Sequence, residues 1–281
     1  MTFQSIDPSD LVISPGVDDY VSRFGGLGRL YGEAAMSRLR DAHVCVIGIG
    51  GVGTWAAEAL GRSGVGSLTL IDMDDVCITN TNRQLPAMEG EVGKAKVQVM
   101  AERLRKINPE IRVLEVHDFF TKGSAESLLA TPYDYVIDAI DDPSQKALMI
   151  VMCQERGIPL VTVGGAGGRW DPTQIQVADL TKAFNDGLLR RVRKTLRRVH
   201  NYSRDNSEWG VASVFSSERA VFPTAEGGLC RTGRQASNLT LDCNSGFGTA
   251  SFVTGVYGFA AASLVVKTIA DPPTPDPEPK R

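Results

Sequence analysis

The sequence lacks the cysteine patterns of zinc-binding and thiol-redox proteins. It has five cysteines and no CxxC pair: Cys45, Cys77, Cys153, Cys230 and Cys243. This spacing excludes a zinc knuckle and a dithiol redox motif. The odd number, with two cysteines inside apolar segments, favours a reducing compartment in which cysteine acts as a small apolar side chain. The opening MTFQSIDPSD lacks the basic and apolar regions of a signal peptide, so we expect a cytoplasmic protein.

The sequence also has little net charge. The formal charge is −3 and the pI about 5.7, so the overall balance gives no argument for nucleic acid and any basic surface must be local. A Tyr-x-x-x-Lys or His/Asp pattern typical of a hydride-transfer site is not evident, which argues against a nicotinamide oxidoreductase.

Long uncharged runs are rare, and residues 246–266 are the exception. Their length is that of a membrane span. They are rich in Gly, Ala, Ser and Thr, however, so we expect a buried helix on the sheet or at a dimer interface. Membrane association is the alternative.

The order of the remaining segments indicates an α/β fold. Predicted strands at 43–48, 67–75, 111–117, 133–141 and 158–165, the first of them a continuous apolar run, alternate with helical patterns at 54–64, 94–109 and 144–157. This rhythm predicts a doubly wound, mostly parallel, Rossmann-like sheet. We expect a nucleotide-binding core over 20–170, a mixed extension with an apolar helix over 171–270, and flexible ends at 1–19 and 271–281. Within the extension, 173–180 and 210–216 are predicted strands and 188–200 a basic helix.

A glycine motif lies where the first of these strands ends and a helix begins. Gly48-x-Gly50-Gly51-x-Gly53 gives a tight turn, a close approach of phosphate to the backbone, and close helix–strand packing. The helix N-terminus offers unpaired N–H groups to an anion. Asp72 follows Gly53 by 19 residues at the end of the next strand, where a carboxylate can accept hydrogen bonds from a ribose. The motif predicts an adenine nucleotide but does not separate NAD from ATP. A tight turn without a ligand is the alternative.

Cations and amides near this motif favour a triphosphate. TNTNRQL carries Asn80, Asn82 and Arg83, and GKAK carries Lys94 and Lys96 at a helix start. Cations of this kind suit ATP better than a pyrophosphate joined to nicotinamide. We expect Lys96 to bind phosphate and Lys94 to be solvated.

Two carboxylates follow the fourth strand in DAIDD. Mg²⁺ prefers one or two carboxylates together with phosphate oxygens and water, whereas a carboxylate before Pro143 can cap the helix that begins there. We predict Asp141 for the metal and Asp142 for the cap.

A strongly basic segment lies in the C-terminal part. Six cations occur within nine residues: Arg190, Arg191, Arg193, Lys194, Arg197 and Arg198. On a helix they cover more than one face, which favours contact with RNA phosphates. A solvated helix is the alternative.

Together these motifs resemble a known family. GIGGVG, LIDMDDVCITNTNRQ, VGKAK and DAIDD are similar to the adenylating enzymes related to ubiquitin activation, which include the activators of sulfur carriers for thiamine and molybdopterin synthesis. Within that family, RFGGLGRLYG, TNTNRQ, GGAGGRWDPTQIQVADL and LDCNSGFGTA resemble the branch that dehydrates threonylcarbamoyladenosine in tRNA.

The resemblance implies a set of roles. ATP and Mg²⁺ would be the cofactors, and tRNA carrying threonylcarbamoyladenosine the substrate. The backbone around Gly51 would cradle the phosphates, Asp72 would hold the ribose, and Asp141 would place Mg²⁺. The phosphates at the α-phosphorus would be bound and stabilised by Asn80, Arg83 and Lys96. Arg83, Lys96 and Asp141 would therefore be the catalytic residues.

Other implied features concern partners. Arg23 or Arg29 would match an arginine that reaches the nucleotide of the neighbouring subunit, so a homodimer is expected. Cysteine-desulfurase or sulfur-acceptor partners follow by family analogy. Cys243 would be either a catalytic thiol or, as we favour, a structural residue. The alternative function is an adenylyltransferase that activates the C-terminus of a ubiquitin-like sulfur carrier; the missing CxxC pairs and the basic segment argue against it.

Overall fold

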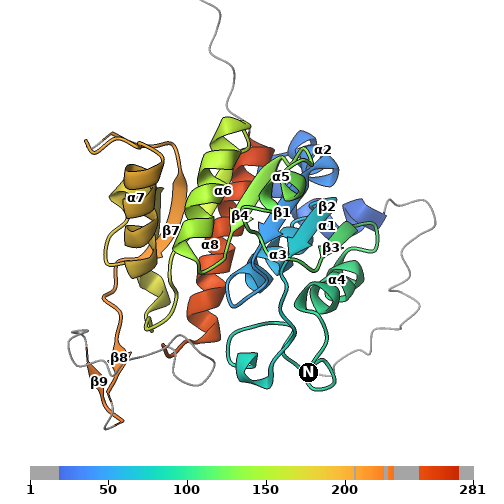
Figure 1. The fold of residues 1–281 in the computed structure, drawn as a ribbon. Coiled ribbons are helices and arrows are strands. Elements are labelled where there is room, and N and C mark those ends of the chain that lie inside the picture. The colour runs from blue at the N-terminus through green and yellow to red at the C-terminus, as the bar shows by residue number, and fades with distance from the viewer. Residues whose placement is uncertain (1–18, 206, 225–226, 231–246, 272–281) are drawn as a thin grey trace, which may run out of the picture.

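The computed structural model describes residues 19–205, 207–224, 227–230 and 247–271 (Figure 1). Its helices are α1 (Asp19–Tyr31), α2 (Glu33–Asp41), α3 (Gly53–Arg62), α4 (Lys96–Ile107), α5 (Ala125–Leu128), α6 (Pro143–Glu155), α7 (Gly187–Val199) and α8 (Ser251–Ala270). Its strands are β1 (His43–Ile47), β2 (Ser67–Ile71), β3 (Arg112–Val116), β4 (Tyr135–Asp138), β5 (Leu160–Val163), β6 (Ile175–Asp179), β7 (Ala212–Ser216), β8 (Phe222–Pro223) and β9 (Leu229–Cys230).

A seven-stranded sheet confirms the predicted fold class. Its order is β3-β2-β1-β4-β5-β7-β6, and every neighbouring pair is parallel except β6 with β7. The predicted strands beyond residue 170 are therefore present as β6 and β7, and they extend the same sheet. The chain order reverses between β1 and β4, and in such sheets ligands bind at the carboxyl ends of the strands near this reversal.

Both faces of the sheet are covered, as the continuous apolar run at 43–48 predicts. In β1, Val44 and Val46 pack with α3, α4 and α8, whereas Cys45 and Ile47 pack with α5 and α6. Accordingly α6 and α8 lie on opposite faces of the sheet (Figure 1). Burial raises the pKa of the Cys153 thiol to about 12, which agrees with the prediction that the core cysteines serve as small apolar side chains.

Within the apolar segment predicted at 246–266, residues 251–266 form most of α8. Its small residues allow a close approach to α3: a Cβ added to Gly258 would lie 2.7 Å from the carbonyl oxygen of Val52, and one added to Gly255 would touch the ring of Trp55. By length and composition α8 could cross a membrane, a test that core helices also pass, and half of its most apolar window is buried in the fold. The composition is thus explained by close packing on α3.

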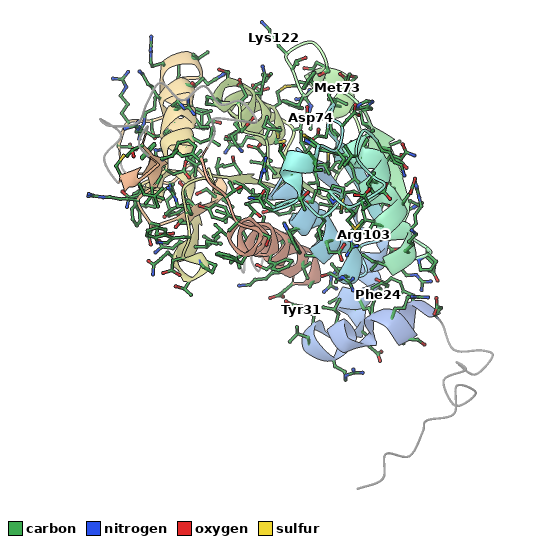
Figure 2. All side chains as sticks on the ribbon, turned by 90° about the horizontal axis from the view of Figure 1, so that it is seen from below. Phe24, Tyr31, Met73, Asp74, Arg103 and Lys122 are labelled. Carbon is green, nitrogen blue, oxygen red and sulfur yellow. The ribbon has the colours of Figure 1, made fainter. Side chains whose placement is uncertain are left out.

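The glycine-rich RFGGLGRLYG forms the greater part of α1 despite its low helix propensity. Tertiary contacts compensate: the buried Tyr20 donates a hydrogen bond of 2.5 Å to the carbonyl of Gly64, and its ring packs on Phe24. Gly64 precedes β2, so α1 lies at the amino end of the sheet. Figure 2 shows Phe24 and Tyr31 of α1 far from Met73 and Asp74, which follow the carboxyl end of β2.

Candidate functional site

The glycines of the loop between β1 and α3 have different structural roles. Gly48 has φ +94°, and a Cβ there would lie 2.8 Å from the backbone carbonyl of Ala139. A Cβ on Gly53 would lie 1.8 Å from the carbonyl oxygen of Gly48. A Cβ on Gly50 would meet nothing within 4 Å. Gly48 and Gly53 therefore serve the turn, whereas Gly50 borders open space that a phosphate can enter.

Asp72 ties this loop to the end of β2. Its Oδ2 accepts a hydrogen bond of 2.6 Å from the N–H of Ile49, and its Oδ1 accepts one of 2.8 Å from the N–H of Asp74. Burial raises the pKa of the Asp72 carboxyl, while the nearby Lys96 acts in the opposite direction. Each carboxylate oxygen can accept a second bond, so acceptor capacity for a ribose remains.

The two lysines of GKAK differ in their surroundings. Lys94 is exposed, and its Nζ lies 2.9 Å from Glu91. Lys96 begins α4 and is 5% exposed. Its Nζ lies 2.7 Å from Oδ2 of Asp74, a carboxylate whose side chain is 61% exposed. A buried ammonium is thus held at the edge of the site with one solvated counter-ion.

Asn80 and Arg83 belong to a short segment that begins with the 3-10 helix η2 (Ile78–Asn80). The Asn80 side chain accepts a hydrogen bond of 3.1 Å from the N–H of Cys77, which fixes the start of this turn. The Arg83 guanidinium donates from Nη1 to the carbonyl of Thr79 at 2.7 Å and to Oδ1 of Asn82 at 3.0 Å. Its stem lies beside Gly51, since a Cβ on that glycine would be 3.5 Å from Arg83 Cγ. The structure therefore brings Arg83 to the glycine loop.

The three aspartates at and after the carboxyl end of β4 have different roles. Asp142 caps α6 by accepting hydrogen bonds of 2.7 and 2.9 Å from the N–H groups of Ser144 and Gln145, so the predicted cap is confirmed. Asp138 is fully buried and pairs at 2.9 Å with the fully buried Lys146. Asp141 is exposed at the turn between these residues.

The surroundings of Asp141 fit a metal that arrives with its nucleotide. Among the described residues, groups of three or more His, Cys, Asp or Glu able to hold a metal by themselves do not occur. Mg²⁺ bound mainly by phosphate oxygens needs only one or two protein carboxylates. An exposed carboxylate on the turn that touches Gly48 fits that donor set.

Sequence reasoning missed Lys146, Trp55 and Asp74. Lys146 resembles a surface lysine because it lies in a helix of mixed composition. Trp55 Nε1 donates to the carbonyl of Arg83 at 3.1 Å, a contact between residues far apart in the chain. The acidic run in LIDMDD did give a signal for Asp74, since all its acids follow the end of β2.

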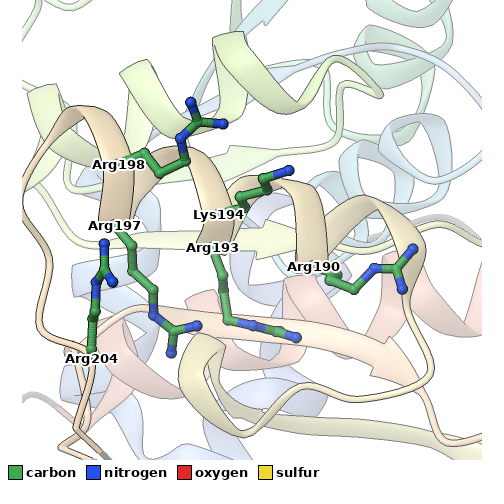
Figure 3. Close-up of a pocket in the computed structure, with 6 residues that line it drawn as sticks. All are labelled: Arg190, Arg193, Lys194, Arg197, Arg198 and Arg204. Atoms are coloured by element: carbon green, nitrogen blue, oxygen red, sulfur yellow. The ribbon is translucent and has the colours of Figure 1, made fainter.

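The basic segment forms a second candidate site. α7 buries one apolar face of Leu188, Leu189, Val192 and Leu196 and directs its cations elsewhere. A cleft of about 420 Å³ is lined by Arg190, Arg193, Lys194, Arg197, Arg198 and Arg204. Figure 3 shows Arg204, which follows α7 in the chain, beside Arg197. Five of the six predicted cations thus line one cleft; the exposed Arg191 is not part of its lining, and Arg204 was not predicted.

Positive charge predominates in this cleft, although the carboxylate of Asp186 acts on Arg193 with the opposite sign. Burial lowers the pKa of Arg193, and the neighbouring Arg197 acts in the same direction. The Arg197 guanidinium lies over the ring of Trp209, 5.2 Å from its centroid. All the residues that line the cleft are cationic, so an anion bound there would relieve their mutual repulsion.

The remaining predicted residues lie apart from the glycine loop. Arg23 pairs at 2.8 Å with Asp19 on α1, and the Arg29 guanidinium lies near Gly25 and Gly26 of the same helix. Both are on α1, at the amino end of the sheet. If either arginine contacts a nucleotide, it would be the nucleotide bound by a neighbouring subunit. Cys243 lies outside the described residues.

Comparison with known proteins assigns the chain to a protein family. The model of the ThiF family matches residues 26–281. The chain belongs to the ThiF family. This ThiF-family chain is 49% identical over 257 residues to the tRNA threonylcarbamoyladenosine dehydratase of Haemophilus influenzae, covering 91% of this chain and 96% of the relative. It is 51% identical over 252 residues to the Escherichia coli enzyme of the same name, covering 89% and 94%.

Solved structures agree with this placement. The E. coli tRNA N6-threonylcarbamoyladenosine dehydratase in complex with ATP matches the ThiF-family chain with a TM-score of 0.80 and 48% identity over 90% of this chain and 96% of that one. The same enzyme in complex with AMP matches equally well, with a TM-score of 0.80. The family resemblance drawn from the motifs is therefore confirmed.

Proposed function

We propose that the protein is an ATP-dependent dehydratase that acts on N6-threonylcarbamoyladenosine in tRNA. It would adenylate the carboxylate of this modification and close it into a ring, with release of pyrophosphate and AMP. The open space at Gly50 carries this proposal, with Arg83 packed beside the next residue, Gly51, and Lys96 close to Asp72. The high identity to named dehydratases over nearly the whole chain supports the choice of substrate.

The proposed chemistry explains why cations surround the phosphates. A free carboxylate is a poor electrophile, because its leaving group would be oxide. When a carboxylate oxygen attacks the α-phosphorus, the bond to pyrophosphate breaks and negative charge builds on the phosphate oxygens. Lys96 and Arg83 are placed to stabilise this charge, and Mg²⁺ held at Asp141 would neutralise the departing pyrophosphate.

The second step needs no nucleophile from the protein. A group within the same modification attacks the activated carbonyl, a five-membered ring closes, and AMP leaves. The net change in the nucleoside is the loss of water. Because ring closure is intramolecular, it gains from proximity. We accordingly keep Cys243 as a structural residue in this proposal.

Pyrophosphate exchange into ATP tests the function. The assay uses three acceptors: tRNA bearing threonylcarbamoyladenosine, the same tRNA without the modification, and a ubiquitin-like carrier protein. We expect exchange with the first alone, together with loss of water from the nucleoside by mass spectrometry. We expect Lys96→Met to lower kcat by about 10²–10³-fold, the usual effect of removing one preorganised charge donor. Exchange with the carrier alone would instead establish the adenylyltransferase function.

We propose that the cleft on α7 binds tRNA phosphates. The sign and density of its charge support this, and neutralising phosphates releases counterions, which makes binding depend on salt. We expect Arg204→Gln to flatten the plot of log K against log salt by about 0.7–0.9 per lost phosphate contact. Arg191→Gln removes the same charge from outside the cleft and should leave the slope nearly unchanged. Equal slopes for both variants would remove the cleft from the proposal.

A homodimer is part of the proposal. Phe252 and Phe259 are exposed on α8, 57% and 46% respectively, and they lie seven residues apart, on one side of the helix. Light scattering measures the mass in solution, and activity regained on mixing Arg23→Ala or Arg29→Ala protein with Lys96→Met protein would test a contribution across the interface. A monomer at assay concentration would refute the homodimer.

The predicted sulfur-transfer partners would be tested by measuring binding of the protein to a cysteine desulfurase.

A further inference from the structure

Arg83 is attached to two helices that lie far from it in sequence. Trp55 of α3 donates from Nε1 to the carbonyl oxygen of Arg83 at 3.1 Å. The hydroxyl of Thr254, in the first turn of α8, lies 3.3 Å from the same oxygen. The neighbouring Asn82 donates from Nδ2 to the carbonyl of Thr249 at 2.9 Å, just before α8 begins. One short segment is therefore fixed to α3 and to the start of α8.

The same groups contact the glycine loop. A Cβ added to Gly51 would lie 3.3 Å from Cγ2 of Thr254 and 3.5 Å from Cγ of Arg83. The glycine loop, the arginine stem and the first turn of α8 therefore pack together at one point. Thr254 itself is 2% exposed, so water does not readily replace its hydroxyl there.

We propose that Trp55 and Thr254 are positioning residues that hold Arg83 against the glycine loop. The inference rests on the role given to Arg83 in the proposed function. A donor that is already in place when charge develops needs no reorganisation, and a displacement of about 1 Å can cost about 10²-fold in rate. The apolar helix α8 thereby contributes to the reaction as well as to the core.

Thr254 and Trp55 differ in how firmly their hydrogen bonds hold the carbonyl of Arg83. Thr254 has one hydroxyl proton, and besides Arg83 it can reach the carbonyls of Ala250 at 3.4 Å and Ser251 at 3.3 Å. Trp55 Nε1 has the Arg83 carbonyl as its acceptor. The larger share of the positioning effect therefore belongs to Trp55.

The test compares Trp55→Phe, Thr254→Val and the double variant with wild type. Arg83→Gln is the reference, and Thr268→Val is the matched control, because it makes the same change on α8 where the hydroxyl donates to Leu264 at 2.9 Å. With saturating modified tRNA, we expect kcat to fall about fivefold for Trp55→Phe and about threefold for Thr254→Val, on the scale of one net hydrogen bond. The KM for ATP should change less than about twofold, as for a loss confined to the transition state. Thr268→Val should match wild type in both constants.

A second readout does not depend on the substrate. The Nε–Hε NMR signal of Arg83, assigned by its loss in Arg83→Gln, should be resolved in ATP-bound wild type and in Thr268→Val. It should broaden in Trp55→Phe and in Thr254→Val. An unchanged signal in both variants overturns the inference, whichever substrate the enzyme takes.

Other outcomes separate the inference from the proposed function. If Arg83→Gln loses activity but Trp55→Phe and Thr254→Val keep the wild-type kcat, the positioning role is wrong and the function stands. If kcat falls in Trp55→Phe and Thr254→Val only in proportion to a fall in Tm, and Thr268→Val shows the same relation, both residues act through core packing. That outcome also overturns the positioning role. Absence of turnover in the wild type would refute the proposed function, while the NMR signal still decides the positioning role.

Discussion

Replacing Gly50 with alanine should separate nucleotide binding from folding. A Cβ at this position meets nothing within 4 Å, and Gly50 is not among the glycines with positive φ. A Gly→Ala change at a compatible backbone stabilises a protein by about 0.4–1 kcal/mol. In a domain of this size that corresponds to a rise of roughly 2–4 °C per kcal/mol in Tm. We therefore expect Gly50→Ala to fold at least as well as wild type.

Nucleotide binding should suffer in the same variant. A phosphate oxygen must approach a backbone N–H to about 2.9 Å to accept its hydrogen bond, and the new methyl group occupies the space from which it approaches. Loss of one hydrogen bond to a charged group costs about 1.5–3 kcal/mol. Affinity for ATP should accordingly fall about 10- to 150-fold.

Calorimetric titration with MgATP, paired with a thermal melt, measures both effects. Gly53→Ala is the contrasting variant, because its Cβ would lie 1.8 Å from the carbonyl oxygen of Gly48 and the backbone must move. We expect it to melt well below wild type, on the scale of 1–3 kcal/mol or more for a forced repacking. A folded Gly50→Ala protein with wild-type affinity would show that the phosphates do not lie over Gly50.

Two further variants test the buried charges. Lys146→Met leaves the fully buried Asp138 without its cation, so we expect a loss of about 3–5 kcal/mol in the free energy of unfolding; a urea midpoint equal to wild type would contradict this. Burial alone would raise the pKa of Glu58, but hydrogen bonds from Arg103 and Arg62 outweigh it and lower that pKa. The unfolded state then binds more protons, so this stabilisation is present above the ordinary value of 4.5 and lost as pH falls through the folded pKa. Glu58→Gln should therefore show a flatter fall of Tm between about pH 6 and 3; parallel curves would rule out the contribution.

Local patterns made much of the fold and of the glycine loop predictable. β2 is buried at all five positions, and the apolar Leu68, Leu70 and Ile71 of SLTLI indicate this directly, although Ser67 and Thr69 are buried with them. Gly48 requires a positive φ and Asp142 caps the helix that begins at Pro143, and both requirements leave a mark within a few residues of sequence. GKAK predicted Lys96 at a helix start, and α4 does begin there; its binding of phosphate stays a prediction.

Contacts between distant segments left no such mark. Trp55 and Thr254 are separated from Arg83 by 28 and 171 residues, so neither could be connected to it by spacing. Arg204 is a single cation outside the basic run and joins the cleft through the path of the chain after α7. The helix α1 contains glycines that disfavour helix, and its stability comes from Tyr20 packing at Gly64, again a tertiary contact.

The pairing of Lys96 with Asp74 shows how a buried ammonium is kept charged in the absence of a ligand. An unpaired ammonium at 5% exposure would be costly, and Asp74 removes that cost through a contact of 2.7 Å. Because the Asp74 carboxylate is largely in water, the pair is only half desolvated, and its partner can be replaced without stranding a second buried charge. A triphosphate over Gly50 would offer Lys96 several anionic oxygens in exchange for one. Under the proposed function, the same lysine would pair with Asp74 in the empty site and with phosphate oxygens once the nucleotide is bound.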